Sequence, residues 1–269
     1  MSTRWEATEK TFLITGGASG LGAQYAQKFL ELGAKKVAVL DISVSVGENF
    51  VASLNETYPG RAVFVKCDVG NEDDITTAFE TVLNDFQRID VIINNAGIMS
   101  DAAHLWSTSN IDNNFNDFQK GLVSFTIKGM KHMRKDEGGA GGTIINISST
   151  TALIKLPTMP IYGGNKIAVL HFSQSLSEPP VFERTGVRIL TMCFGPTATP
   201  LMENILERAI DKKVAEEFYS TVESAVNAFI TMFEEGSPGS IWLSLSNKPV
   251  QNITEIIQNI FAELKKLII

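Results

Sequence analysis

Three side chains in one stretch of the chain have the types and the spacing to act on a single oxygen atom: Ser149, Tyr162 and Lys166. Tyr162 and Lys166 are four residues apart, and residues at this spacing share one face of a helix. An ammonium stabilises a neighbouring phenolate, which can accept a proton from an alcohol. A serine hydroxyl can hold the same oxygen by a hydrogen bond while it becomes a carbonyl. These residues are candidates for alcohol oxidation or the reverse reduction.

The segments around these residues predict how they are positioned. Residues 143–147 are β-branched or apolar and are bounded by glycine and hydroxyl residues, which predicts a buried strand of a parallel sheet. Ser148 and Ser149 follow at its carboxyl end, where open α/β sheets bind ligands. A helix is predicted from Tyr162 to about Ser177. On its own, the Tyr-x-x-x-Lys pattern equally fits a solvent-exposed helix, so the rest of the chain decides its meaning.

A glycine-rich turn near the start of the chain predicts a phosphate-binding loop. Residues 11–15 predict the first strand, and Gly16, Gly20 and Gly22 follow it before a helix that ends near Gly33. Glycines allow a tight turn and a close backbone approach, and the helix N-terminus offers unpaired N–H groups to a pyrophosphate. A glycine turn without a ligand is the simpler alternative. The order strand, turn, helix favours a dinucleotide site.

An acidic residue follows the second predicted strand, where dinucleotide-binding chains hold a ribose. Residues 36–40 form that strand and Asp41 closes it. Its carboxylate can accept hydrogen bonds from both ribose hydroxyls and would repel a 2′-phosphate. Neither the glycine loop nor Ile42 and Ser43 supplies an arginine that would neutralise such a phosphate. We therefore predict NAD as the cofactor rather than NADP.

Strands and helices alternate along the rest of the chain. Further strands are predicted at residues 62–67, 91–94, 187–193 and 240–245. A helix with acidic residues in its first turn is predicted at residues 71–86. This alternation predicts right-handed crossovers and a parallel sheet whose strand order reverses beside the first strand. The predicted fold is α/β, a Rossmann-type doubly wound parallel sheet of about seven strands in a single domain over residues 1–269.

The composition argues against several classes of protein. The 269 residues are 44% hydrophobic, enough for one large core, and the net charge of −7 without a cluster of bases argues against nucleic-acid binding. No apolar run reaches the roughly 18 residues of a membrane span. The start lacks a signal-peptide core and the end is not a peroxisomal tripeptide, so we expect a cytoplasmic location.

The cysteines and histidines do not form a recognisable metal pattern. Cys67 and Cys193 lie within or at the end of predicted strands, and we expect them to be buried free thiols. His104, His132 and His171 are scattered and complete no zinc pattern. We therefore expect no metal site.

Taken together, these motifs resemble the short-chain dehydrogenase/reductase family over nearly the whole chain. The resemblance rests on motifs in one order and spacing: Thr15-Gly16-x-x-x-Gly20-x-Gly22, Asp68, Asn94-Asn95-Ala96-Gly97, Ser149 and Tyr162-x-x-x-Lys166. Within the family, the stretch Ile144–Lys166 and Asp41 are most similar to the NAD-dependent group that includes 15-hydroxyprostaglandin dehydrogenases and insect alcohol dehydrogenases.

The resemblance implies a role for each matching position. Asp68 and Val69 would hold the adenine, Asn95 would support the central strand and the cofactor, and Lys166 would also hold the nicotinamide ribose. Thr199 fits the threonine that contacts the nicotinamide carboxamide. A homodimer or homotetramer is implied as well. The complete predicted set for cofactor binding is Thr15, Gly16, Ser19, Gly20, Leu21, Gly22, Asp41, Ile42, Asp68, Val69, Asn95, Ala96, Gly97, Tyr162, Lys166, Gly195, Thr197 and Thr199.

Two positions depart from the pattern of the family. A helical asparagine usually completes a proton relay from the lysine through water, and ungapped counting puts Phe118 at that position. Either Asn114, Asn116 or Gln119 substitutes after a local shift, or the relay is altered and turnover is slower. Phe194 replaces a common proline and would reshape the floor of the cofactor site.

The family places a mobile substrate lid after the sixth strand, here at about residues 197–220. This segment mixes charges with apolar residues, as an amphipathic lid should: Leu201, Met202, Ile205 and Leu206. The segment before Tyr162 also supplies apolar residues: Leu153, Ile154, Leu156 and Met159. Together they predict an apolar pocket wall and a hydrophobic, lipid-like alcohol as substrate. Simple packing into the core explains the same residues at least as well.

The end of the chain predicts an amphipathic helix at about residues 252–267. Asn252 and Glu255 are spaced as a capping box, and apolar residues recur on one stripe from Ile253 to Leu264. Such a stripe must be buried. It packs either on its own subunit or in a subunit interface.

The sequence as a whole predicts an NAD-dependent short-chain dehydrogenase/reductase acting on CH–OH groups of a small molecule, a secondary or hydrophobic alcohol or its carbonyl. Tyr162 would be the acid/base, Ser149 would orient the oxygen, and Lys166 would support the phenolate. One alternative, suggested by Phe118 and Phe194, is a protein that binds NAD and an apolar ligand with weak or no turnover. Another is epimerisation or dehydration on the same scaffold.

Overall fold

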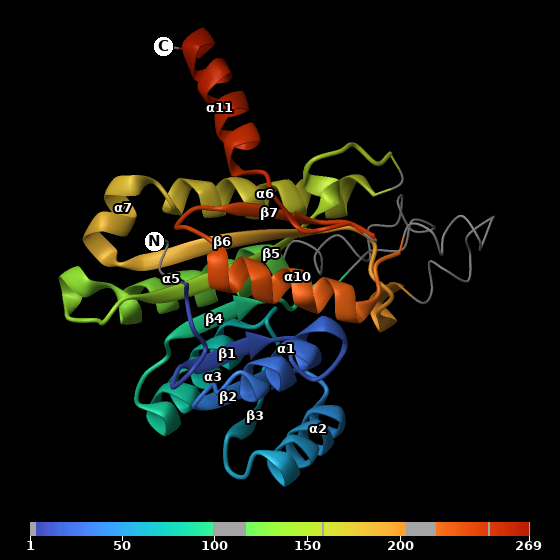
Figure 1. Cartoon of the computed structure of the whole chain (residues 1–269). Coiled ribbons are helices and arrows are strands. Elements are labelled where there is room, and N and C mark those ends of the chain that lie inside the picture. Colours follow the sequence, from blue (N-terminus) through green and yellow to red (C-terminus); the bar gives the residue numbers. More distant parts are fainter. Residues whose placement is uncertain (1–3, 99–116, 158, 203–218, 247, 269) are drawn as a thin grey trace.

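The β-branched and apolar segments of the chain form one eight-stranded sheet. The computed structural model describes residues 4–98, 117–157, 159–202, 219–246 and 248–268, with the backbone alone at 117–119. The strand order is β3-β2-β1-β4-β5-β6-β7-β8 (Figure 1). The strands are β1 (Thr11–Thr15), β2 (Lys36–Asp41), β3 (Ala62–Lys66), β4 (Val91–Asn94), β5 (Gly142–Ser149), β6 (Val187–Phe194), β7 (Ile241–Ser244) and β8 (Gln251–Asn252).

Seven of these strands are parallel, and β8 pairs antiparallel with β7 at the edge. The order reverses beside β1, which pairs with β2 on one side and with β4 on the other. This arrangement confirms the predicted Rossmann-type α/β fold. The two-residue β8 is the difference from the seven predicted strands, because its pairing depends on tertiary contact rather than on a strand-like sequence.

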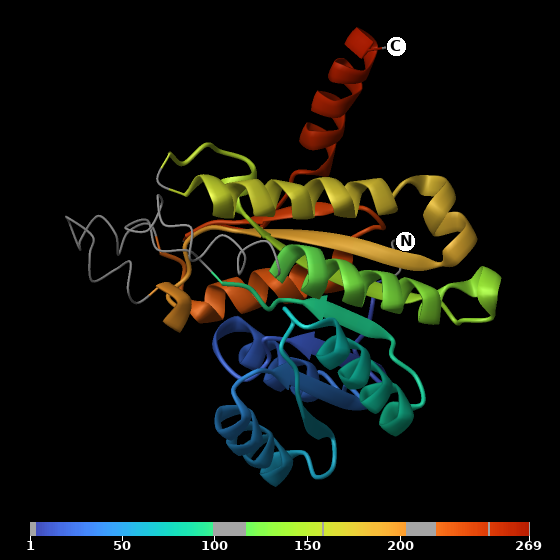
Figure 2. The same cartoon turned by 180° about the vertical axis from the view of Figure 1, so that it is seen from behind.

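Helices cover both faces of the sheet. The helices are α1 (Gly20–Glu31), α2 (Val44–Thr57), α3 (Glu72–Phe86), α5 (Val123–Met133), α6 (Pro160–Leu176), α7 (Pro179–Thr185), α10 (Val222–Glu235) and α11 (Thr254–Ile268). One core lies between the sheet and α1, α2 and α10, and a second lies under α3 and α5. Figures 1 and 2 show these two layers from opposite sides. Among the described helices, none is long and apolar enough to cross a membrane.

A chain of buried hydrogen bonds fixes α6 against β5. Asn94 donates through Nδ2 to Asn146 Oδ1 (2.8 Å) and to Thr126 Oγ1 (3.0 Å). Asn146 in turn donates through Nδ2 to Ser173 Oγ (2.9 Å) on α6. All four side chains are buried. Because unpaired polar groups are costly in the interior, these bonds restrict β4, β5, α5 and α6 to one arrangement.

The C-terminal helix differs from the prediction that its apolar stripe is buried. α11 has no buried residue. Ile253 just before it is buried, and Ile257 is partly buried against the core cluster that contains Ile253 and Ile241. The ring of Phe261 still lies beside His171 of α6, with 6.1 Å between the ring centroids. Past Phe261, α11 is directed away from the sheet (Figure 1). Packing on its own subunit therefore accounts only for the part of the helix up to this residue.

A buried arginine ties β6 to the end of α10. Arg188 is fully buried, and its Nη1 donates to the carbonyls of Phe233 (2.9 Å) and Gly236 (2.8 Å). These carbonyls belong to a helix end, where backbone acceptors lack helical partners. The Trp5 ring lies 3.9 Å from the guanidinium carbon. Burial lowers the pKa of Arg188 to about 9, which is still above neutral pH, so the group remains charged.

We expect Arg188→Met to lower the free energy of unfolding by about 3 kcal/mol, because buried carbonyls lose their donor. Urea unfolding followed by circular dichroism measures the change. The control is Arg184→Met, which removes an exposed guanidinium 3.3 Å from Asp136 and should cost less than about 1 kcal/mol. Equal effects of the two substitutions would contradict a structural role for the buried group.

Candidate active site

A cavity of about 630 Å³ opens where the carboxyl ends of the parallel strands meet. This volume is ordinary for a ligand pocket. The segments after β1, β2, β3, β4, β5 and β6 all contribute residues to its lining. Because parallel strands all end at the same edge of the sheet, segments far apart in the sequence form a single site.

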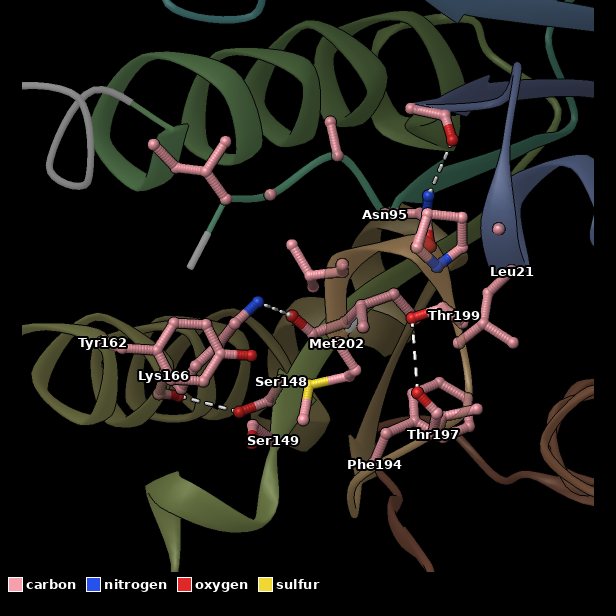
Figure 3. Close-up of a pocket in the computed structure, with 18 of the residues that line it drawn as sticks. Leu21, Asn95, Ser148, Ser149, Tyr162, Lys166, Phe194, Thr197, Thr199 and Met202 are labelled. Atoms are coloured by element: carbon pink, nitrogen blue, oxygen red, sulfur yellow. Dashed lines mark hydrogen bonds between the residues drawn. The ribbon is translucent and has the colours of Figure 1, made fainter. Parts of the chain in front are cut away.

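Ser149, Tyr162 and Lys166 lie along one side of this cavity (Figure 3). Ser149 ends β5, whereas Tyr162 and Lys166 come from the first turns of α6. Lys166 Nζ is 5.5 Å from the centroid of the Tyr162 ring. The Ser149 Oγ accepts a hydrogen bond from the Thr151 N–H (3.2 Å), so its own proton can be donated to a ligand oxygen. All three predicted residues therefore line the same cavity.

Reciprocal hydrogen bonds join the lysine to β5. Lys166 Nζ donates to the Ile147 carbonyl (3.1 Å), and Ser148 Oγ donates to the Lys166 carbonyl (2.8 Å). A Cβ at Gly97 would lie 3.7 Å from the same Nζ. The ammonium is therefore held between the end of β5, the turn after β4 and the tyrosine ring.

The turn after β1 has the backbone of an anion-binding loop. Gly16 and Gly20 have φ of +62° and +53°, a region that favours glycine. Ser19 is the N-cap residue of α1, and its side chain makes no capping hydrogen bond. Gly20 and Leu21 then line the cavity. The first N–H groups of α1 are thus available to a negatively charged group, such as a phosphate.

Asn95 ties the turn after β4 to the turn after β1. Its Nδ2 donates to the carbonyls of Thr15 (3.0 Å) and Gly16 (3.1 Å). The Thr15 Oγ1 accepts from the N–H groups of Asn95 and Ala96, each at 3.1 Å. Thr15 itself is buried and does not line the cavity. Thr15, predicted to bind the cofactor, therefore supports the site only indirectly, by holding Asn95 in place.

Two carboxylates lie at the far end of the cavity, after β2 and β3. Asp41 accepts from the N–H groups of Ala18 (3.1 Å) and Ser43 (3.0 Å), which fix its orientation beside the glycine turn. Asp68 accepts from the Gly70 N–H (2.8 Å). Among the described residues that line the cavity, the charged ones are these two and Lys166. Negative charge thus gathers at the end where Asp41 lies.

The segment after β6 forms the opposite wall (Figure 3). Phe194 is buried at the end of the strand and lines the cavity together with Gly195. Thr197 pairs with Ser220 in an isolated parallel bridge, and the Thr199 Oγ1 donates to the Thr197 carbonyl (3.3 Å). A Cβ at Gly20 would lie 3.8 Å from the Thr199 Cβ, so this wall closes against the glycine turn.

Most of the predicted site residues line the cavity, but several do not. Gly22 packs behind the glycine turn, Leu153 packs in a core cluster, and Ile154 is exposed. Leu156, Met159, Leu201 and Met202 do line the cavity. Asn114, Asn116, Ile205, Leu206 and most of the predicted lid lie outside the described residues. Phe118 lies in a π-helical turn, η3 (Asp117–Leu122), with only its backbone described.

The cavity also contains residues that the sequence did not single out for it. They include Ile98, Thr150, Thr151, Pro200 and Tyr219. These residues belong to none of the motifs named above. They line the cavity because the loops that contain them pass beside it. Ile98 and Thr150 could have been predicted, because each lies within a few residues of the carboxyl end of a strand.

Both cysteines are buried and free, as predicted. Burial raises the pKa of each thiol to about 12. Cys67 lines the cavity, and Cys193 in β6 is the register partner of Ser148 in β5. Burial therefore disfavours the thiolate, which is the nucleophilic form of cysteine, at both positions.

The model of the short chain dehydrogenase family matches residues 10–210. The chain belongs to the short-chain dehydrogenase family. The rat (Rattus norvegicus) 15-hydroxyprostaglandin dehydrogenase (NAD(+)) is 30% identical over 238 residues, which cover 84% of this chain and 86% of the rat protein. Alcohol dehydrogenase 2 of Ceratitis capitata is 30% identical over 215 residues, or 79% and 80% of the two chains.

A solved structure shares the fold of this short-chain dehydrogenase. The 3-ketoacyl-(acyl-carrier-protein) reductase from Brucella melitensis, complexed with NADH, superposes with a TM-score of 0.77 at 23% identity. The match covers 90% of this chain and 99% of that one. This likeness shows the fold, and the family match and the curated relatives make the chain an oxidoreductase of the short-chain dehydrogenase family.

We expect Gly22→Ala to disrupt the glycine turn. An added Cβ would lie 2.2 Å from the Gly16 carbonyl oxygen and 2.7 Å from Asn95 Nδ2, so the turn must shift and stability should fall by about 1–3 kcal/mol. Thermal unfolding with and without NAD measures both the loss and the weaker stabilisation by the dinucleotide. Gly164→Ala on α6 is the control, because nothing lies within 4 Å of its added Cβ. A turn that tolerates both changes equally would contradict this packing.

Proposed function

We propose that this short-chain dehydrogenase oxidises a hydrophobic alcohol with NAD, or carries out the reverse reduction. The observation that carries the proposal is the convergence of Ser149, Tyr162 and Lys166 on one side of the cavity, with 5.5 Å between the ammonium and the phenol ring. A hydroxyl donor, a proton acceptor and a fixed positive charge around one point suit the conversion of an alcohol oxygen to a carbonyl oxygen.

In this proposal Tyr162 and Ser149 act on the alcohol oxygen, and Lys166 acts on Tyr162. Tyr162 takes the hydroxyl proton, and Ser149 holds the oxygen with a hydrogen bond as the double bond to carbon forms. Lys166 places its positive charge beside the ring that carries the negative charge of the phenolate. In the reverse direction Tyr162 returns the proton to the oxygen.

The residues of the cavity fit NAD. The free N–H groups after Ser19 suit the pyrophosphate, and Asp41 is already oriented to accept from ribose hydroxyls. When bound, NAD supplies a nicotinamide ring that accepts the hydride from the carbinol carbon. Lys166 and Thr199 lie where they could hold the nicotinamide ribose and carboxamide.

The charge at Asp41 favours NAD over NADP. A 2′-phosphate would meet this carboxylate, and the described lining supplies no arginine to neutralise it. Asp68 adds a second negative charge to the same end of the cavity. The relatives named 15-hydroxyprostaglandin dehydrogenase (NAD(+)) agree with this preference.

The wall near Tyr162 favours an apolar substrate. Its described members at this end include Ile98, Leu156, Met159 and Met202. The carboxylates of the lining lie after β2 and β3, away from α6. A cationic group next to the reacting carbon would lose its hydration without gaining a carboxylate partner. The names of the relatives, hydroxyprostaglandin and alcohol dehydrogenases, also point to alcohols.

We expect Tyr162→Phe to lower turnover of a hydrophobic alcohol by at least about 100-fold, because the proton acceptor is lost. NADH formation followed by absorbance, over a panel of short-chain and lipid-like alcohols, measures the rate. Titration with NAD should give an unchanged dissociation constant. Tyr58→Phe, which removes a hydroxyl outside the cavity, is the control.

This experiment also separates dehydrogenation from the competing functions. A protein that binds NAD and an apolar ligand without turnover would form no NADH in the wild type. Epimerisation or dehydration would also give no net NADH, but products would appear by chromatography. An active Tyr162→Phe variant would refute the assignment of the acid/base.

We expect Asp41→Asn to weaken NAD binding and to improve NADP binding, with a change in their ratio of about tenfold or more. The reason is that the amide keeps the size of the carboxylate and removes its charge. Titration with both dinucleotides measures the ratio. Glu48→Gln on the exposed face of α2 removes one charge outside the cavity and is the matched control. A wild type that prefers NADP would contradict the charge argument.

A further inference from the structure

Ser148, the residue before Ser149 in β5, faces the helix α6. Successive side chains of a strand point to opposite faces of the sheet, and Asn146, two residues earlier, bonds to Ser173 of α6. Ser148 continues this row. It borders the cavity but is only 2% exposed, and its Oγ donates to the Lys166 carbonyl (2.8 Å; Figure 3). Its proton is thus bound by the protein and not offered to a ligand.

Two adjacent residues of β5 hold Lys166 at both of its ends. The Ile147 carbonyl accepts from Nζ (3.1 Å), and Ser148 Oγ donates to the backbone carbonyl of the same lysine (2.8 Å). Both distances are those of ordinary hydrogen bonds. Together they close a ring that includes the whole lysine side chain, which otherwise moves freely on its flexible stem. The ring restricts the ammonium to one place, 5.5 Å from the centroid of the Tyr162 ring.

The charge of Lys166 is the nearest one to Tyr162 among the charged residues of the described lining. The other two, Asp41 and Asp68, follow β2 and β3 at the far end of the cavity. Lys155, in the loop before α6, is exposed, so that solvent screens its charge. The attraction between two charges falls with the distance between them. The ionisation of Tyr162 therefore depends mainly on where the Lys166 ammonium is held.

The remaining titratable groups around the lysine are neutral in character. Burial raises the pKa of Cys67, in the lining, to about 12 and also raises the pKa of Tyr219 on the opposite wall. Cys193 is the register partner of Ser148, and burial raises its pKa to about 12, although the Ser148 hydroxyl and the Lys166 charge act against this rise. None of these groups supplies a charge that competes with the ammonium near neutral pH.

We propose that Ser148 is a positioning residue for Lys166 and, through it, for Tyr162. This inference rests on the function proposed above, in which the Tyr162 phenolate accepts the proton of the alcohol. The Ser148 hydroxyl fixes the backbone of Lys166, while the Ile147 carbonyl fixes its ammonium. The distance between the ammonium and the ring stays short, which favours the phenolate. Without the hydroxyl, the ring of bonds is open and the ammonium can move away from the phenol.

The ionisation of Tyr162 in the full chain tests this inference. The ultraviolet absorbance of phenolate is followed against pH, as the difference between each protein and the same protein carrying Tyr162→Phe. Because the chain has only four tyrosines, this difference isolates the Tyr162 signal well. We expect Ser148→Ala to move the titration to higher pH by about half a unit or more. Circular dichroism at each pH ensures that the folded protein is measured.

The matched control is Gln174→Met. Gln174 Nε2 donates to the Gly239 carbonyl (3.0 Å) and so also ties α6 to the rest of the subunit, but it lies about two turns beyond Lys166. This substitution should lower the thermal midpoint of unfolding and leave the Tyr162 titration unchanged. An unchanged titration in Ser148→Ala, or an equal shift in Gln174→Met, would overturn the inference.

The titration needs no substrate, which separates this inference from the proposed function. If the wild type oxidises alcohols, the acid limb of kcat against pH should move upward in Ser148→Ala by the same amount as the titration, and it should stay in place in Gln174→Met. A wild type that forms no NADH with any alcohol would contradict the proposed function. The titration would then still decide whether Ser148 positions the ammonium.

Discussion

The buried hydrogen bonds of Asn146 set the geometry on which the site depends. This side chain accepts from Asn94 in β4 and donates to Ser173 in α6. In the dry interior such a chain of bonds tolerates little displacement, because any broken bond leaves a polar group unpaired. Ser149 follows Asn146 at the end of β5, and Lys166 precedes Ser173 by seven residues, nearer the start of α6. The reactive residues are therefore carried on rigid elements, and their relative position comes from the core beneath them.

The other half of the cavity is built differently. Around the glycine turn, Asn95 and Thr15 connect backbone groups of two loops, and Asp41 is held by two N–H groups. These loops are positioned by hydrogen bonds between side chains and the backbone, so the amide, hydroxyl and carboxylate groups at these positions are needed. The exception is where backbones approach closely, as at Gly22, where no side chain fits.

Much of this arrangement follows from local patterns in the sequence. The strands were predictable because buried parallel strands require uninterrupted β-branched and apolar runs. The meeting of Ser149 with Tyr162 and Lys166 was predictable because strand ends define the site and a four-residue spacing defines a helix face. The supporting roles of Thr15 and Gly22, which pack behind the cavity lining, could not be predicted. Spacing alone does not distinguish a residue that touches a ligand from one that holds the lining residues in place.

The other differences come from long-range contacts. The periodicity of α11 indicates an apolar face but not what covers it, and the direction of the helix depends on the single residue, Ile253, between β8 and α11. The antiparallel β8 has no strand-like composition, because two residues are enough to extend an existing edge. Tyr219 enters the cavity because the Thr197–Ser220 bridge returns the chain to β6, a contact between residues with no shared local pattern.

The burial of both thiols has a practical consequence for studying this molecule in solution. With Cys67 and Cys193 buried and strongly disfavoured as thiolates, the native fold carries no reactive sulfur that would compete for a maleimide. A single cysteine introduced on any exposed surface would therefore accept a fluorophore or spin label selectively, without prior removal of the natural ones. Fluorescence or spin-label spectroscopy could then measure distances and motions in a chain that is otherwise unaltered.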